Sequence, residues 1–221
     1  MSATTDRWKQ RQSMPCDYLL FDLGQVLVRL RSFDFLKRFK PGWSETRIAR
    51  WWGGLECMRL FETGRIDEPT FLQRAVDETA FAGTIAEFRR LFAGWVVGVY
   101  PGAEDLVDRL RTQVRIGVLS NTNSLHIQLL GRRTGLLDAF HDRFYSFEMG
   151  LLKPDKRIYA QVLARTGVPA ARMMFFDDNR TNIAAAAAMG IQAIRVSDFD
   201  DLLRKLDRWQ LGKTANDEER G

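Results

Sequence analysis

Residues 18–28 read "YLLFDLGQVLV", and the first half of this stretch has the form of a buried strand. Four apolar residues, Tyr18 to Phe21, precede Asp22, and a short apolar run of this kind is typical of a strand in a parallel sheet. An aspartate directly after such a run needs a reason to be there, because charged side chains are rarely buried. We therefore expect Asp22 at the carboxyl end of the strand, where it can take part in chemistry.

The same form returns four times downstream. The runs "VRIGVLS", "RFYSF", "RMMFF" and "IQAIRV" predict further strands, the first ending at Ser120 and the third at Asp177 and Asp178. Helical patterns lie between them, including "DKRIYAQVLART", a helix that Pro154 is expected to open because proline suits the first helical turn. This alternation predicts an α/β fold, a Rossmann-like doubly wound parallel sheet with helices on both faces.

Ligands of such sheets bind outside the carboxyl ends of the strands. Asp22, Ser120, Asp177 and Asp178 all stand at predicted strand ends, so we expect one site at that edge. Adjacent carboxylates repel each other unless a cation lies beside them, and Mg²⁺ prefers hard oxygen ligands. Asp177 and Asp178 are equally suited to cap the following helix, and capping and metal binding can coexist.

The segment 32–96 has a different character. Its apolar residues keep helical spacing throughout, and no strand signal interrupts them, so it predicts a small all-helical cap inserted after the first strand. We expect an α/β core at 15–31 and 97–212, and flexible tails at 1–14 and 213–221.

The segments "FDLGQVLV", "VLSNTNSLH", "GLLKPDKRIY" and "FFDDNRTN" together resemble, in order, the motifs of the haloacid dehalogenase (HAD) superfamily. The resemblance is to the sugar-phosphate phosphatases that include α-D-glucose-1-phosphate phosphatase, and "FETGRI" is similar to a segment of their helical cap. It implies a Mg²⁺-dependent phosphatase in which Asp22 attacks phosphorus and forms an aspartyl-phosphate that water hydrolyses.

The resemblance also implies the roles of the other residues. Phosphate oxygens, which carry the charge of the transition state, would be held by Ser120, Asn121 and the catalytic Lys153. The remaining implied residues are the metal ligands Asp22, Gly24 (through its carbonyl) and Asp178, and the supporting residues Asp177 and Asn182, the latter orienting Lys153 or the metal shell.

Gly24 is a departure from most phosphatases of this superfamily, which carry an acid two residues after the nucleophile. Loss of proton transfer is typically worth ~10²–10⁴-fold in rate. A sugar 1-phosphate tolerates that loss, because its anomeric hydroxyl is a better leaving group than an ordinary alcohol, and the glucose-1-phosphatase branch itself carries Asp-Leu-Gly. His126 could replace the acid, since histidine titrates near pH ~6.5, or be a packing residue.

Two other classes of protein stay open. A 2-haloacid dehalogenase uses the same aspartyl-ester chemistry on carbon and also lacks the second acid, but it leaves the cluster of Asp177 and Asp178 unexplained. A non-catalytic protein that binds phosphorylated ligands is the third class. In the cap, Trp43, Trp51 and Trp52 are candidates for stacking on a sugar ring, or for packing in the core of the cap.

The chain has 221 residues and a formal charge of +5, with its basic residues scattered and without a recognised nucleic-acid motif. No signal peptide or membrane span is apparent, and Cys16 and Cys57 have no ligand-like spacing. We expect a cytoplasmic monomer or homodimer that acts on a small phosphorylated metabolite and binds neither nucleic acid nor membranes.

Overall fold

The computed structural model describes residues 16–32, 34–37 and 40–212, so the two predicted tails lie outside the described residues. A five-stranded sheet with the order β5-β4-β1-β6-β7 forms the centre, and all of its pairs are parallel. Its strands are β1 Tyr18–Phe21, β4 Arg115–Ser120, β5 Asp142–Tyr145, β6 Met173–Asp177 and β7 Gln192–Arg195.

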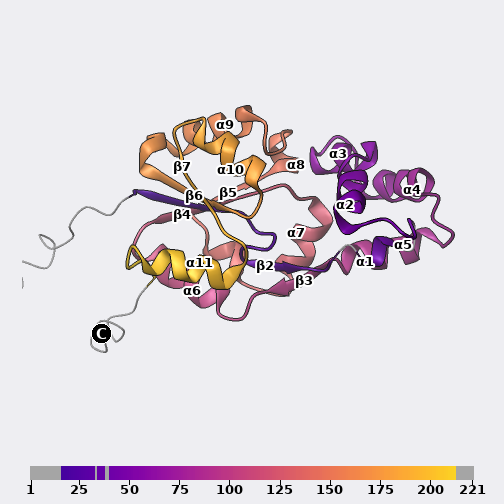
Figure 1. Cartoon of the computed structure of the whole chain (residues 1–221), viewed down its shortest axis with the longest axis horizontal. Helices are drawn as coiled ribbons and strands as arrows, with labels where there is room; N and C mark the ends of the chain where they lie inside the picture. Colours follow the sequence, from indigo (N-terminus) through magenta and orange to yellow (C-terminus); the bar gives the residue numbers. More distant parts are fainter. Residues whose placement is uncertain (1–15, 33, 38–39, 213–221) are drawn as a thin grey trace, which may run out of the picture.

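Helices cover both faces of this sheet (Figure 1). In β1, Leu19 and Phe21 point into one core with α6 (Ala103–Arg111) and α11 (Phe199–Asp207), whereas Tyr18 and Leu20 point into a second core on the other face. The helices of that second core are α8 Ser146–Met149, α9 Lys156–Thr166 and α10 Arg180–Ala187. The predicted doubly wound α/β fold is therefore confirmed. No helix in the described part of the chain is long and apolar enough to cross a membrane.

Three local features differ from the sequence-based expectation. Two short strands, β2 (Val28–Leu30) and β3 (Val96–Val99), form an antiparallel pair that was not expected. The run "RFYSF" stops being a strand at Tyr145, because α8 begins at the next residue. Pro154 does not open α9: Asp155 is the N-cap, its side chain accepting a hydrogen bond from the backbone of Arg157.

Between β2 and β3 the described residues form five helices, which we call the helical insertion. Polar N-cap side chains at Ser44, Asp67 and Thr84 start three of them. A cluster of aromatic side chains fills the space between them, with Phe61 stacked on Phe71 at 4.4 Å. The helices are α1 Asp34–Lys37, α2 Glu45–Gly53, α3 Glu56–Glu62, α4 Glu68–Thr79 and α5 Ile85–Ala93, to one side of the sheet in Figure 1.

The helical insertion contacts the sheet domain through α7 (Ser124–Gly131), the helix that follows β4. Leu125 of α7 is buried in the core of the helical insertion, and the His126 ring stacks on Phe92 of α5 at 4.4 Å. The carboxyl end of β4 therefore leads directly into the contact between the two parts of the molecule.

Candidate active site

The sheet brings the predicted residues to one edge. β1 pairs with β4 on one side and β6 on the other, so Asp22 lies between the ends of strands that finish at Ser120 and Asp177. One carboxylate oxygen from each of Asp22, Asp177 and Asp178 lies within 4.8 Å of the others. A strand-end site was predicted, and the structure brings these three acids together.

Lys153 reaches the same place from the loop before α9, and its side chain is 1% exposed. Its Nζ lies 3.0 Å from Asp22 Oδ1, 2.7 Å from Asp177 Oδ2 and 3.0 Å from the carbonyl of Leu119. Burial lowers the pKa of Lys153, but the charges of the two aspartates outweigh it, and the pKa lies above its usual value. The three donors of the ammonium group each have a partner, so a phosphate oxygen would have to share one of them.

Asp177 is fully buried and is held by donors on both oxygens. Its Oδ1 accepts from the backbone of Asn179 at 2.8 Å, and Asn182 Nδ2 lies 3.1 and 3.0 Å from its two oxygens. Asn182 therefore orients Asp177, and acts on Lys153 only through it. Helix capping falls to Asn179, whose side chain accepts from Thr181 at the start of α10, and to neither aspartate.

The electrostatics of the cluster fit a cation. Burial raises the pKa of Asp22 to about 7; Lys153 works against this rise, and the charges of Asp177 and Asp178 add to it. Burial and the charge of Asp177 also raise the pKa of Asp178. Both shifts come first from burial and then from repulsion between the acids, and a divalent cation bound beside them would favour the ionised forms against both effects. With the oxygens of Asp177 occupied by donors, Asp22 and Asp178 are the carboxylates left for Mg²⁺.

Gly24 follows Asp22 in a tight turn with Val28. The backbone N–H of Gln25 donates to the carbonyl of Val28, and the N–H groups of Val26, Leu27 and Val28 donate to the carbonyl of Leu23, so none of these hydrogen bonds uses the carbonyl of Gly24. A Cβ at position 24 would lie 3.0 Å from Leu30 Cδ1. Leu30 thus fills the space beside Gly24 in which a side chain at this position would begin.

Asn121 differs from the expectation that its side chain binds phosphate. Its Nδ2 donates to the carbonyl of Lys153 at 2.9 Å, and its Oδ1 accepts from the backbone N–H of Lys153 at 2.8 Å. The amide therefore fixes the loop that carries Lys153. Ser120 is buried at the end of β4, where its hydroxyl faces the same site.

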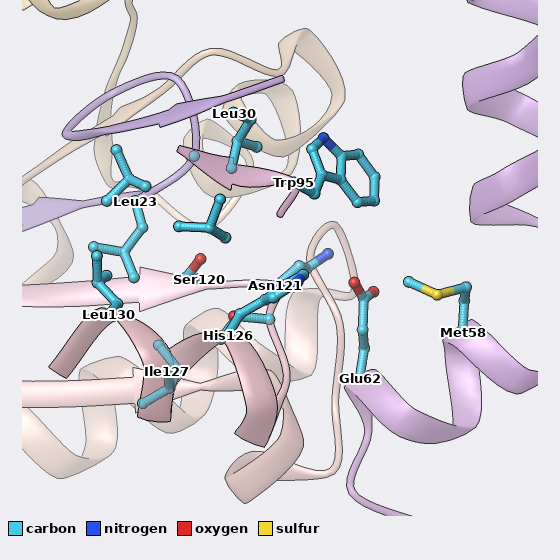
Figure 2. Close-up of a pocket in the computed structure, with 14 residues that line it drawn as sticks. Leu23, Leu30, Met58, Glu62, Trp95, Ser120, Asn121, His126, Ile127 and Leu130 are labelled. Atoms are coloured by element: carbon cyan, nitrogen blue, oxygen red, sulfur yellow. The ribbon is translucent and has the colours of Figure 1, made fainter. Parts of the chain in front are cut away.

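A cavity of about 130 Å³ lies between these strand ends and the helical insertion (Figure 2). Its polar residues are Glu62, Ser120, Asn121, Thr122 and His126. The rest of its lining is Gly24 and eight apolar side chains: Leu23, Val28, Leu30, Met58, Trp95, Val96, Ile127 and Leu130. The cavity residues Glu62, Met58 and Trp95 were not predicted as site residues from the sequence. Two signals pointed to them: Glu62 lies in the segment "FETGRI", and the i, i+4 spacing of Met58 and Glu62 puts both on one face of α3.

His126 lines this cavity, and its contacts fit a packing residue better than the alternative in which it replaces the missing acid. Its Nε2 donates to the carbonyl of Phe92 at 2.9 Å, and its Nδ1 lies 3.2 Å from Asn123 Nδ2. Burial lowers its pKa to about 4. The ring is therefore neutral near pH 7, with its one proton held by a backbone carbonyl, and it is a packing residue at the contact with α5.

Trp43, Trp51 and Trp52, for which stacking on a sugar ring and packing in the cap were both open, do not line the cavity. Trp52 is buried in the core of the helical insertion, and Trp43 and Trp51 meet edge to face at 6.4 Å. Trp95, between α5 and β3, is the tryptophan in the lining of the cavity, and its indole N–H donates to the carbonyl of Arg31.

Comparison with curated proteins gives several hydrolase relatives. The chain is 27% identical over 175 residues to pyrimidine 5'-nucleotidase YjjG of Escherichia coli (strain K12), a match that covers 71% of this chain and 74% of the relative. It is 29% identical over 151 residues to phosphoglycolate phosphatase of Rhodospirillum rubrum, covering 65% and 60%. Magnesium-dependent phosphatase 1 of Homo sapiens is 29% identical over 116 residues, covering 52% and 61%.

Solved structures share the fold. A HAD-family enzyme of Bacteroides thetaiotaomicron, in complex with magnesium and inorganic phosphate, matches 81% of this chain and 93% of its own with a TM-score of 0.69 at 22% identity. L-2-haloacid dehalogenase of Xanthobacter autotrophicus matches 89% and 84% with a TM-score of 0.59 at 20% identity. A sequence model of the family matches residues 17–190, most of the described chain, and the protein therefore belongs to the haloacid dehalogenase-like hydrolases.

Proposed function

We propose that the protein is a Mg²⁺-dependent phosphatase that hydrolyses a small phosphorylated metabolite through an aspartyl-phosphate on Asp22. The observation that carries this proposal is the buried ion pair of Asp22 and Lys153 beside the acids Asp177 and Asp178. A nucleophilic carboxylate, a fixed positive charge and a divalent-cation site are the parts that phosphoryl transfer needs. Relatives of this chain named as phosphatases and a nucleotidase support the same reaction.

Each residue of the site has a separate role in the proposed reaction. Asp22 Oδ attacks phosphorus, and Lys153, held by Asp177, favours the ionised form of the attacking carboxylate and fixes its position. The hydroxyl of Ser120 donates to a phosphate oxygen. Mg²⁺, held by Asp22, Asp178 and the carbonyl of Gly24, would supply positive charge for the phosphate oxygens.

For the substrate we propose a sugar phosphate, as in the glucose-1-phosphatase branch. The flat indole of Trp95 supports this choice, because it offers a surface in the cavity on which the apolar face of a sugar ring can stack. The helical insertion, whose residues Met58 and Glu62 line one side of the cavity, would then be the cap that excludes water during the reaction.

The second candidate is a 2-haloacid dehalogenase. It is favoured by the absence of an acid at Gly24, where Leu30 occupies the space in which a side chain would begin. Against it stands Asp178, whose pKa is already raised by burial and by Asp177. An anionic haloacid would bring further negative charge to that place, whereas Mg²⁺ turns the same carboxylate into an anchor for phosphate.

Phosphate release from a panel of phosphorylated metabolites and from 4-nitrophenyl phosphate tests the proposal. We expect turnover that EDTA stops and Mg²⁺ restores, and that a folded Asp22→Asn protein loses. Metal-independent halide release from 2-chloropropionate would instead identify a dehalogenase. No turnover of any ester or halide with Mg²⁺ present would leave a protein that only binds its ligand.

We also propose a cytoplasmic location and a small-molecule substrate as the binding partner, with the chain acting as a monomer or homodimer. Cys16 and Cys57, both buried and unpaired, support a reducing compartment.

A further inference from the structure

Glu62 is a carboxyl group in the cavity to which the proposed mechanism gives no role. It is the last residue of α3, and its side chain rises from that helix into the space between Met58 and Asn121 (Figure 2). Gly24 lines the same cavity from the sheet side. Glu62 therefore shares one cavity with Gly24, the position that lacks an acid, and with Ser120 at the end of β4.

The environment of Glu62 favours the protonated form. Among the described residues, none makes a hydrogen bond or ion pair with this partly buried carboxyl group. Burial alone raises its pKa to about 7. His126, the other titratable side chain in the cavity lining, is neutral at that pH. A general acid works best when its pKa lies near the working pH, because it then both holds a proton and gives it up readily.

The chain after Glu62 fixes α3 against the sheet domain. Gly64 has φ +66°, and a Cβ there would collide with the backbone carbonyl of Phe147 in α8. Thr63 closes the helix, its hydroxyl donating to the carbonyl of Arg59 at 2.7 Å. Only glycine permits this close approach. The contact holds the end of α3, and with it Glu62, at one distance from the strand ends.

We propose that Glu62 is the general acid and base of this phosphatase and takes the place of the acid missing at Gly24. The inference rests on the proposed phosphatase function and deepens it. A proton donor within the helical insertion has a physical consequence: the acid stands on the same part of the molecule that excludes water from the site, so proton transfer and exclusion of water depend on the same anchored helix.

The proton and bond changes balance over two steps. In the first, an Asp22 oxygen bonds to phosphorus, the bond from phosphorus to the leaving oxygen breaks, and Glu62 gives that oxygen its proton, so an alcohol leaves. In the second, ionised Glu62 takes a proton from water as the water oxygen bonds to phosphorus. The bond between phosphorus and Asp22 breaks, releasing phosphate, free Asp22 and protonated Glu62.

The test compares Glu62→Gln with the wild type on 2,4-dinitrophenyl, 4-nitrophenyl and phenyl phosphate, with Mg²⁺ present. The three esters differ mainly in the acidity of the leaving phenol. For phenyl phosphate we expect kcat/KM to fall about 10²-fold or more, the typical share of a general acid. For 2,4-dinitrophenyl phosphate kcat/KM should change little, because its phenolate leaves without a proton. Slow hydrolysis of the phospho-enzyme should then give a burst of dinitrophenol.

Glu56→Gln is the matched control, because Glu56 is an exposed glutamate on the same helix, and its ion pair within the described residues is with Arg59 at 3.6 Å. It should leave all three kcat/KM values as they are. An equal loss on all three esters in Glu62→Gln, with the wild type active, would overturn the role of Glu62 and leave the phosphatase standing. An inactive wild type would instead remove the phosphatase proposal, and the inference with it.

Discussion

Asp22, Asp177 and Asp178 are three acids with unequal surroundings. Asp177 has a donor on each oxygen and an ion pair with Lys153, so its charge is compensated within the protein. Asp178 is half-buried, and both burial and the neighbouring Asp177 raise its pKa. At the scale of single residues, therefore, Asp177 stabilises the fold of the site. Asp178 is the acid whose ionised form the surrounding protein disfavours, and a bound cation would stabilise that form.

Replacing each of these two acids by asparagine separates the roles. Asp177→Asn leaves Lys153 with a weakened buried partner, and we expect it to cost about 3–5 kcal/mol in the free energy of unfolding, as for a broken buried pair. Asp178→Asn removes a repelled carboxylate, so in EDTA near pH 7 its stability should equal or exceed that of the wild type, while Mg²⁺-dependent activity is lost. Urea unfolding in EDTA and phosphate release measure the two effects. Equal destabilisation by both substitutions would contradict this division.

At the scale of elements, one loop sets the distance between α3 and the sheet domain. Gly64 combines a positive φ with a close approach to the carbonyl of Phe147, and both features exclude a side chain. The helical insertion has its own aromatic core and also buries Leu125 of α7. α3 and α7 each contribute residues to the lining of the cavity, and the position of Glu62 depends on how α3 is anchored.

Gly64→Ala should break that anchor. We expect it to cost about 1–3 kcal/mol, the usual price of a strained backbone conformation, and to lower kcat/KM for phenyl phosphate more than for 2,4-dinitrophenyl phosphate. Gly53→Ala is the control, because Gly53 lies in α2 with open space around its Cβ position. It should be neutral or stabilising. Thermal melts and the two kcat/KM values check this, and a Gly64→Ala protein with wild-type kinetics would show that the anchor does not matter.

At the scale of the whole molecule, the proposed metal site would couple ligand binding to folding. Asp22 and Asp178 come together when β1 and β6 pair, so we expect Mg²⁺ to bind the folded chain better than the unfolded one. A ligand that binds only the folded state stabilises it by about 2.7 kcal/mol at one hundred times its dissociation constant. Mg²⁺ should therefore raise the Tm of the wild type and not that of Asp178→Asn.

The Mg²⁺-induced rise in Tm should become smaller as the pH falls. The pKa of Asp22 lies at about 7, so this acid takes up a proton below neutral pH, and the proton then competes with Mg²⁺; burial and Asp177 shift the pKa of Asp178 in the same direction. Differential scanning calorimetry at pH 8 and pH 5.5, with Mg²⁺ or EDTA, gives the comparison. A Mg²⁺-induced rise in Tm that is equal at both pH values would count against these acids as the ligands.

The sequence by itself determined the parallel sheet and the edge at which the site lies. Apolar runs that end at Asp22, Ser120 and Asp177 follow from local burial, and the carboxyl ends of parallel strands necessarily share one edge. Only the tertiary structure decided which side chains are already occupied: Asn121 by the backbone of Lys153, and His126 by the carbonyl of Phe92. Hydrogen-bond partners and pKa values depend on residues distant along the chain. The contact of Leu30 with the space beside Gly24 and the position of Glu62 in the cavity depend on such residues too. A linear pattern carries no information about distances between such residues, so these features had to come from the folded molecule.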